Sequence, residues 1–191
     1  MHKGRLEAFS DGVIAILITI MILELKVPRG TDVAALAPVL PVFLVYVLSF
    51  VFLGIYWSNH HHMLQAADRV NGKILWANLH LLFWLSLTPF VTGWMGENHA
   101  AAVPTAAYGG VLLLSAIAYI ILQNAIIAAQ GPGSKLAAAV QGDVKGKVSL
   151  LLYAAAIPLA FVKPVIAIVL YVAVALTWLV PDRRIESRLQ R

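Results

Sequence analysis

Long apolar runs, separated by short polar breaks, make up most of this chain. The breaks contain proline, glycine or clusters of charged residues, which commonly end helices. A helix rises about 1.5 Å per residue, so about 20 apolar residues cross a hydrocarbon layer about 30 Å thick. The pattern therefore predicts six transmembrane helices, over residues 6–25, 33–64, 73–94, 104–129, 148–162 and 164–180.

Some of these predicted helices depart from a simple span. The second, 33–64, is long enough to tilt or to project beyond the membrane. Pro89 lies inside the third, and Pro158 interrupts the short fifth. The last two could instead form one re-entrant hairpin around residues 162–164, and the charge pattern fits both arrangements. The apolar runs leave no room for a separate soluble domain, so we expect residues 1–191 to form one six-helix unit.

The composition indicates an all-α integral membrane protein. Hydrophobic residues make up 61% of the 191 positions and charged residues only 12%, whereas a soluble domain is about one quarter charged. The chain contains no cysteine, which excludes disulfides, thiolate nucleophiles and cysteine metal sites. The first apolar run is too long for a cleavable signal, and no clear small-residue cleavage site ends it. We therefore interpret it as a retained helix.

The positive charges predict the orientation. With six spans, 11 of the 14 Lys and Arg residues fall on one side of the membrane, and three, Lys26, Arg29 and Lys163, fall on the other. Short cytoplasmic loops carry the excess of positive charge, so both termini are predicted to be cytoplasmic. Attraction of these flanks to anionic lipid also explains the net charge of +5. Nucleic-acid binding is not expected, because there is no basic soluble module.

The first predicted helix has two distinct faces. Successive helix positions differ by about 100°, which places four residues within about 60° of Ile16: Gly12, Thr19, Ile20 and Leu23. This stripe is mostly apolar and carries one hydroxyl group. Ser10 and Asp11 lie on the opposite side, near the predicted cytoplasmic end of the helix.

The polar end of this helix predicts a buried network. An ionisable group inside a membrane helix is a candidate functional residue and needs a partner. The second helix runs the opposite way, so its last residues should reach the level of Asp11. We expect Ser10 and Asp11 to pair with Arg5 and with one of three histidines: His60, His61 or His62. Alternatively, Arg5 and Glu7 extend toward water, and Asp11 only stabilises the first turn through the helix dipole.

The three consecutive histidines are a weak candidate for a metal site. Neighbouring helix positions point about 100° apart, so three of them cannot easily bind one ion. No His pair spaced by four residues and no His-Glu-x-x-His motif is present. Two of them could meet His80 of the third helix, but nothing in the pattern requires it. We predict no metal and no cofactor, although a histidine beside a carboxylate could titrate near neutral pH.

Three stretches of the chain form a recognisable set. Residues 5–25, RLEAFSDGVIAILITIMILEL, contain an Arg, three further residues, Phe-Ser-Asp, and then a branched-apolar helix with an embedded Thr. This resembles the first-helix signature of the transmembrane protein 175 family, the endosomal and lysosomal potassium channels and their prokaryotic homologues. Residues 56–63, YWSNHHHM, and 87–98, LTPFVTGWMGEN, resemble the ends of the family's second and third helices. His62 departs from the pattern, because a basic residue is common there, so the histidine that pairs with Asp11 stays open.

The resemblance implies a potassium-selective, leak-like channel for monovalent cations in the cell membrane. It also implies a homotetramer whose pore is lined by the first helix of each subunit. No TVGYG motif occurs, so a carbonyl-lined filter of that type is not indicated. By position, Ile16 would form a narrow hydrophobic constriction, Ile20 and Leu23 further apolar rings, and Thr19 a ring of hydroxyl groups. The supporting network would comprise Arg5, Phe9, Ser10, Asp11, His60 and His61.

Other interpretations compete with the channel. The apolar stripe could be a packing seam inside one bundle, with Thr19 bonded back to its own helix. The chain could also be a proton- or cation-coupled secondary transporter that uses Asp11 and the histidines of 60–62. Such transporters usually contain internal repeats and broken helices, and no repeat is evident here. A metalloenzyme is disfavoured by the missing ligand spacing, so we predict a channel and not an enzyme.

Overall fold

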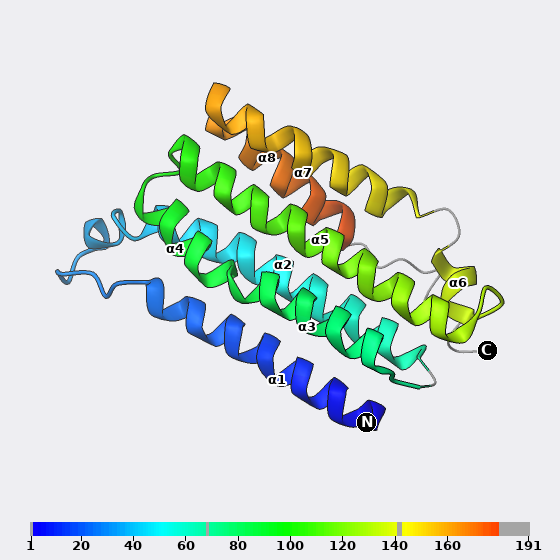
Figure 1. Ribbon diagram of the computed structural model, residues 1–191. Helices are drawn as coiled ribbons and strands as arrows, with labels where there is room; N and C mark the ends of the chain where they lie inside the picture. The colour runs from blue at the N-terminus through cyan, green and yellow to red at the C-terminus, as the bar shows by residue number, and fades with distance from the viewer. Residues whose placement is uncertain (1, 68, 141–142, 180–191) are drawn as a thin grey trace.

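The computed structural model consists of helices and connecting loops throughout the residues that it describes, 2–67, 69–140 and 143–179. Figure 1 shows the long helices side by side in alternating directions, so that α8 runs back toward the end of the bundle where α1 begins. The α-helices are α1 (Lys3–Met21), α2 (Leu40–Gln65), α3 (Gly72–Ser86), α4 (Thr88–Glu97), α5 (Ala102–Gln130), α6 (Lys135–Val140), α7 (Val144–Val162) and α8 (Pro164–Leu179), and two short 3-10 helices are η1 (Ile22–Glu24) and η2 (Val33–Leu36).

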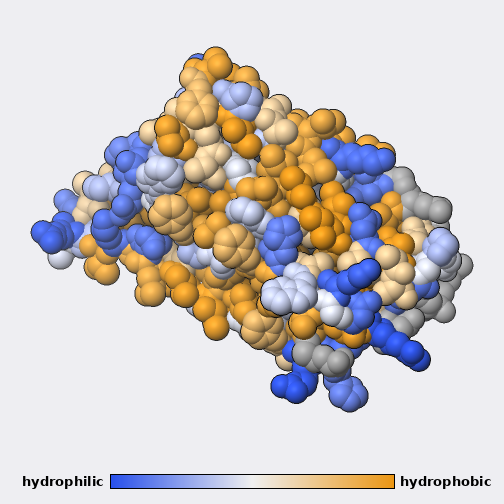
Figure 2. Space-filling model, viewed as in Figure 1, coloured by the Kyte–Doolittle hydropathy of each residue, from blue (hydrophilic) through white to orange (hydrophobic). Residues whose placement is uncertain are grey.

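Five helical stretches of the described residues are long and apolar enough to cross a membrane: α1 with η1, α2, α3 with α4, α5, and α7. The sixth predicted span corresponds to α8, which is apolar but shorter, with 16 residues. Its predicted last residue, 180, and the C-terminal arginines counted in the charge pattern lie outside the described residues. Figure 2 shows apolar side chains over most of the middle of the visible face, with hydrophilic ones concentrated at the two ends of the bundle.

The prediction for the second helix was wrong at its start. Instead of continuing from residue 33, the chain forms η2 and a turn, and α2 begins only at Leu40. Asp32 caps η2 by accepting the backbone N–H of Ala35 at 3.2 Å. Pro41 then occupies the first turn of α2, where a residue without an N–H breaks no helical hydrogen bond. Apolar composition alone did not reveal this boundary.

The two prolines inside predicted helices affect the helices differently. The predicted third helix is divided at Pro89: α3 ends at Ser86, and α4 begins at Thr88 with Pro89 in its first turn. In contrast, α7 continues through Pro158.

Helix α7 begins four residues before the predicted position, because the carboxylate of Asp143 caps it. The loop that precedes α7 contains α6, which the pattern did not predict.

Buried side chains form two apolar clusters that run through the bundle. The first joins α1 and α3 to the parts of α2 and α5 beside them, and it includes Leu6, Ile14 and Leu81. The second joins α2, α4, α5, α7 and α8, and it includes Tyr108 and Tyr171. Helix α1 contributes only to the first cluster, so it lies at the edge of the subunit, as Figure 1 shows.

Gly96 allows α4 to pack directly against α2. A Cβ atom at this position would lie 2.8 Å from the Cα of Val42, too close for any real contact. We therefore expect Gly96→Ala to cost about 1–3 kcal/mol of stability, because the backbone of α2 would have to move. Gly110→Ala in α5 is the control, since nothing lies within 4 Å of that position. The unfolding temperatures of the two purified variants test this prediction. Equal unfolding temperatures for Gly96→Ala and Gly110→Ala would show that α2 can move away from α4 without loss of stability.

Candidate functional site

The exposed face of α1, together with Leu23 in the following η1, carries the apolar stripe that the sequence singles out. Ile16 is 57% exposed and Leu23 77% exposed, and Thr19 and Ile20 are exposed on the same face. The opposite face packs into the subunit core and comprises Leu6, Ser10, Ile14, Leu17 and Met21. The stripe is therefore not a packing seam within this chain, as one alternative supposed, because none of its side chains is buried by the chain's own helices.

Thr19 places a hydroxyl oxygen on this stripe. Its Oγ1 lies 2.9 Å from the carbonyl oxygen of Ile16 and 3.2 Å from that of Ala15, so the hydroxyl donates its proton to its own helix. A hydroxyl oxygen has two lone pairs in addition to its proton. Because the proton is directed at the helix backbone, these lone pairs are left to interact with a cation or with water.

Three buried polar side chains join α1, α2 and α3. Asn78 donates from Nδ2 to the Oγ of Ser10 at 2.9 Å, and its Oδ1 lies 2.6 Å from Nε2 of His60. Because an amide oxygen can only accept, this geometry assigns the proton of His60 to Nε2. Ser10 also donates to the carbonyl oxygen of Leu6 at 2.8 Å. All three polar side chains are buried, so the network links the rotation of α1 to the positions of α2 and α3.

This network differs from the predicted one. Ser10 and His60 belong to it, but they are joined by Asn78, which the sequence reasoning missed. The signal was available, because Asn78 is the only amide in the apolar run 74–86. Among the described residues, no hydrogen bond or ion pair joins Asp11 to Arg5 or to a histidine, so this pairing stays a prediction. No described residue forms an ion pair or hydrogen bond with the Arg5 guanidinium.

Asp11 instead accepts the indole N–H of Trp57 at 3.1 Å. Successive helix positions point about 100° apart. The rotation of α1 that buries Ser10 therefore places Asp11 at the edge of the contact between α1 and α2. The Trp57 side chain of α2 reaches Asp11 at this edge. Phe9, the third member of the signature, lies exposed on the stripe side of α1. Thus the three signature residues face three different environments.

The remaining histidines do not converge. His61 bonds to the side chain of Gln65 through Nε2 at 2.8 Å and stacks on Trp57, whereas the His62 ring meets the His61 ring edge to face. His80 accepts the indole N–H of Trp84 at 2.8 Å. Among the described residues, no three His, Asp or Glu side chains come close enough together to hold a metal ion.

The far end of α1 is tied to α4. Lys26, in the loop that follows α1, forms an ion pair with Glu97, the last residue of α4. The hydrogen bond to Glu97, together with its negative charge, raises the pKa of Lys26. Glu24 lies against Gly93 of α4, where a side chain would collide with its carboxylate. These contacts hold the Leu23 end of the stripe beside α4.

Comparison with known proteins agrees with the resemblance of the first helix. The model of a family described as endosomal/lysosomal potassium channel TMEM175 matches residues 5–89. A protein named as a potassium channel in Chryseobacterium sp. (strain P1-3) is 57% identical over 190 residues, which cover 100% of this chain and 99% of that protein. One named as a potassium channel in Streptomyces collinus (strain DSM 40733 / Tue 365) is 36% identical over 126 residues, which cover 62% of this chain and 61% of that protein.

A solved structure matches the fold almost end to end. The crystal structure of a lysosomal potassium-selective channel TMEM175 homolog from Chamaesiphon minutus superposes with a TM-score of 0.78 and 28% sequence identity. The match covers 92% of this chain and 95% of that chain. The apolar helices and these relatives together indicate a multi-pass membrane protein. The chain therefore belongs to the TMEM175 family, a family of ion channels and not of enzymes.

Proposed function

We propose that this chain forms a potassium-selective, leak-like channel in the cell membrane, with α1 lining the pore. The observation that carries the proposal is the exposure of four residues, three on one face of α1 and one in η1, away from the subunit core: Ile16, Thr19, Ile20 and Leu23. Membership of a potassium-channel family supports it. In a homotetramer with both termini in the cytoplasm, four copies of this stripe would face a common axis.

A ring of four isoleucine side chains can close such a pore. A hydrated cation that enters a ring without polar ligands loses water and gains no replacement, so the constriction dewets and resists conduction. A small rotation or outward shift of α1 would be needed to open it. Thr19 lies one turn further along the same face, where its hydroxyl oxygen would replace part of the lost hydration. The preference for potassium would arise there, without a carbonyl-lined filter.

The buried network would set the direction in which the stripe points. Ser10, Asn78 and His60 come from three different helices, and a rotation of α1 would leave at least one of them without its partner. An unpaired buried polar group costs about 1–3 kcal/mol. The bond between Asp11 and Trp57 adds a second contact on the neighbouring side of α1. We infer that these contacts hold the stripe toward the pore axis.

Ion flux into liposomes tests the channel directly. We expect the purified full chain to carry passive potassium flux, faster than sodium flux under the same gradient, with no requirement for a second ion. Protein-free liposomes are the control for leakage of the bilayer. Flux that depends on a counter-transported proton or cation and saturates at slow turnover would instead support the transporter that uses Asp11 and the histidines.

A further inference from the structure

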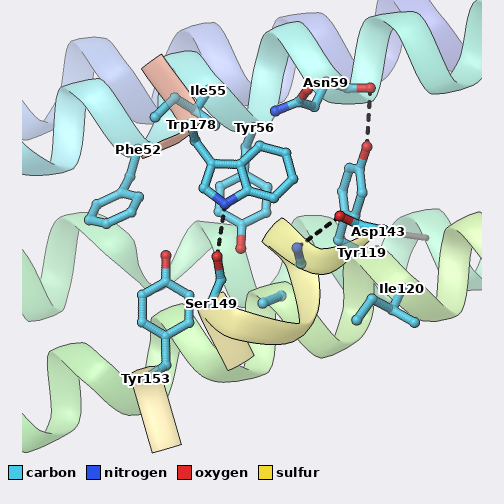
Figure 3. A pocket seen from close by; sticks show the side chains of 12 residues that line it. Phe52, Ile55, Tyr56, Asn59, Tyr119, Ile120, Asp143, Ser149, Tyr153 and Trp178 are labelled. Carbon is cyan, nitrogen blue, oxygen red and sulfur yellow. Dashed lines mark hydrogen bonds between the residues drawn. The ribbon is translucent and has the colours of Figure 1, made fainter. Parts of the chain in front are cut away.

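A cavity of about 60 Å³ lies between α2, α5, α7 and α8, outside the contacts of α1 (Figure 3). Small residues leave this space open, because Ala116, Gly146 and Ser149 line it where larger side chains would fill it. It is large enough for more than one water molecule or for a small organic group. No role in the proposed pore explains it, since the stripe of α1 does not contribute to its lining.

Five of the twelve residues that line the cavity are aromatic. Tyr56 meets Tyr119 edge to face with ring centres 6.2 Å apart, and Phe52 meets Tyr153 in the same way at 6.2 Å. Trp178 reaches in from α8, and its indole N–H donates to the Oγ of Ser149 at 2.9 Å. Figure 3 shows these rings around one space. Aromatic faces carry partial negative charge, so such a cage attracts cations.

Polar groups in the lining have capacity to bind a ligand. Tyr153 is only 3% exposed, and Figure 3 shows its hydroxyl pointing into the cavity, as does the hydroxyl of Tyr56. Each of these two hydroxyl oxygens has lone pairs that can accept a hydrogen bond from an occupant of the cavity. Asp143 is the one charged residue among the described residues of the lining, and its charge is negative.

We propose that this cavity binds an ammonium group carried on an apolar body. The aromatic faces attract the cation, the carboxylate of Asp143 balances its charge, and the hydroxyls of Tyr56 and Tyr153 accept its N–H groups. An anion would be repelled by the carboxylate, and a neutral alcohol would gain neither of the two charge interactions. The ammonium group could belong to a free amphiphilic amine or to the head group of phosphatidylethanolamine. The site does not depend on ion conduction by α1.

Binding of n-butylamine, with n-butanol as the neutral probe of the same shape, tests the proposal. The full chain is placed in phosphatidylglycerol nanodiscs, which contain no ammonium lipid, and titrated by saturation-transfer NMR. Wild type should bind butylamine at least about tenfold more tightly than butanol, as expected for one charged hydrogen bond. Equal affinity for the two probes would overturn the proposal.

A variant that removes the negative charge of Asp143 tests the role of this carboxylate in binding butylamine. Asparagine caps a helix as well as aspartate, so Asp143→Asn should retain the bond to the Gly146 N–H while losing the charge. We expect butylamine affinity to fall about tenfold. Asp32→Asn is the matched control, because Asp32 caps η2 in the same manner outside the cavity and should leave the affinity unchanged.

A cavity-filling variant and a second lipid complete the test. Ala116→Leu should fill the space and abolish butylamine binding at this site, separating it from attraction to the anionic bilayer. Wild-type affinity in both Asp143→Asn and Ala116→Leu would overturn the proposal. In phosphatidylethanolamine nanodiscs, loss of butylamine binding by wild type would assign the site to the lipid head group. Unchanged binding there would assign it to free amines.

Discussion

Replacing Ile16 with asparagine is expected to increase cation current and to reduce the preference for potassium over sodium. Ile16 is 57% exposed in the subunit, so the change leaves the core of the bundle intact. In the proposed homotetramer, four amide groups around the pore axis would hold water at the proposed constriction. Removing about 1.4 kcal/mol from the barrier would raise the current about tenfold. Single-channel recording in a planar bilayer with potassium and sodium exchanged measures both effects.

Val169→Asn provides the matched control for this experiment. Val169 lies on α8 and is 58% exposed, so the same amide is added at the same exposure but away from α1. Wild-type current is expected from it. If Ile16→Asn also conducted and selected ions as the wild type does, Ile16 could not form the constriction, and another part of the chain would have to line the pore.

Replacing Asn78 with leucine is expected to lower the stability of the subunit by about 2–4 kcal/mol. Leucine is close to asparagine in size, but it leaves Nε2 of buried His60 without a partner and removes the donor to Ser10. Helix α1 would then lose the contact that sets its rotation, so current should fall as well. The unfolding temperature of the purified chain and its liposome flux measure the two effects.

A matched asparagine and a double-mutant cycle make this prediction specific. Asn98 is exposed, and among the described residues its side chain donates only to the carbonyl oxygen of Trp94, so Asn98→Leu should remain close to wild type. Ser10→Ala combined with Asn78→Leu should destabilise less than the sum of the two single changes, because both remove the same hydrogen bond. Additive effects would show that Ser10 and Asn78 are not energetically coupled.

The helical spans and the two faces of α1 could be predicted from the sequence, because both depend on local periodicity. A rotation of about 100° per residue separates Ile16 and Ile20 from Ser10 wherever the helix lies. The exposure of the first two and the burial of the third agree with that arithmetic. Helix starts were less predictable, since residues 33–39 are apolar enough for a helix and yet form η2 and a turn.

Only the tertiary structure decided which polar groups meet. A bond between helices depends on the depth and rotation of two separate elements, and a slip of one turn moves a side chain by about 5.4 Å. Thus the sequence could indicate that Ser10, Asp11 and the histidines need partners, but not that Asn78 bridges Ser10 to His60 or that Trp57 reaches Asp11. The aromatic cavity likewise depends on how separate helices pack together. Its rings come from four helices whose relative positions no local pattern encodes.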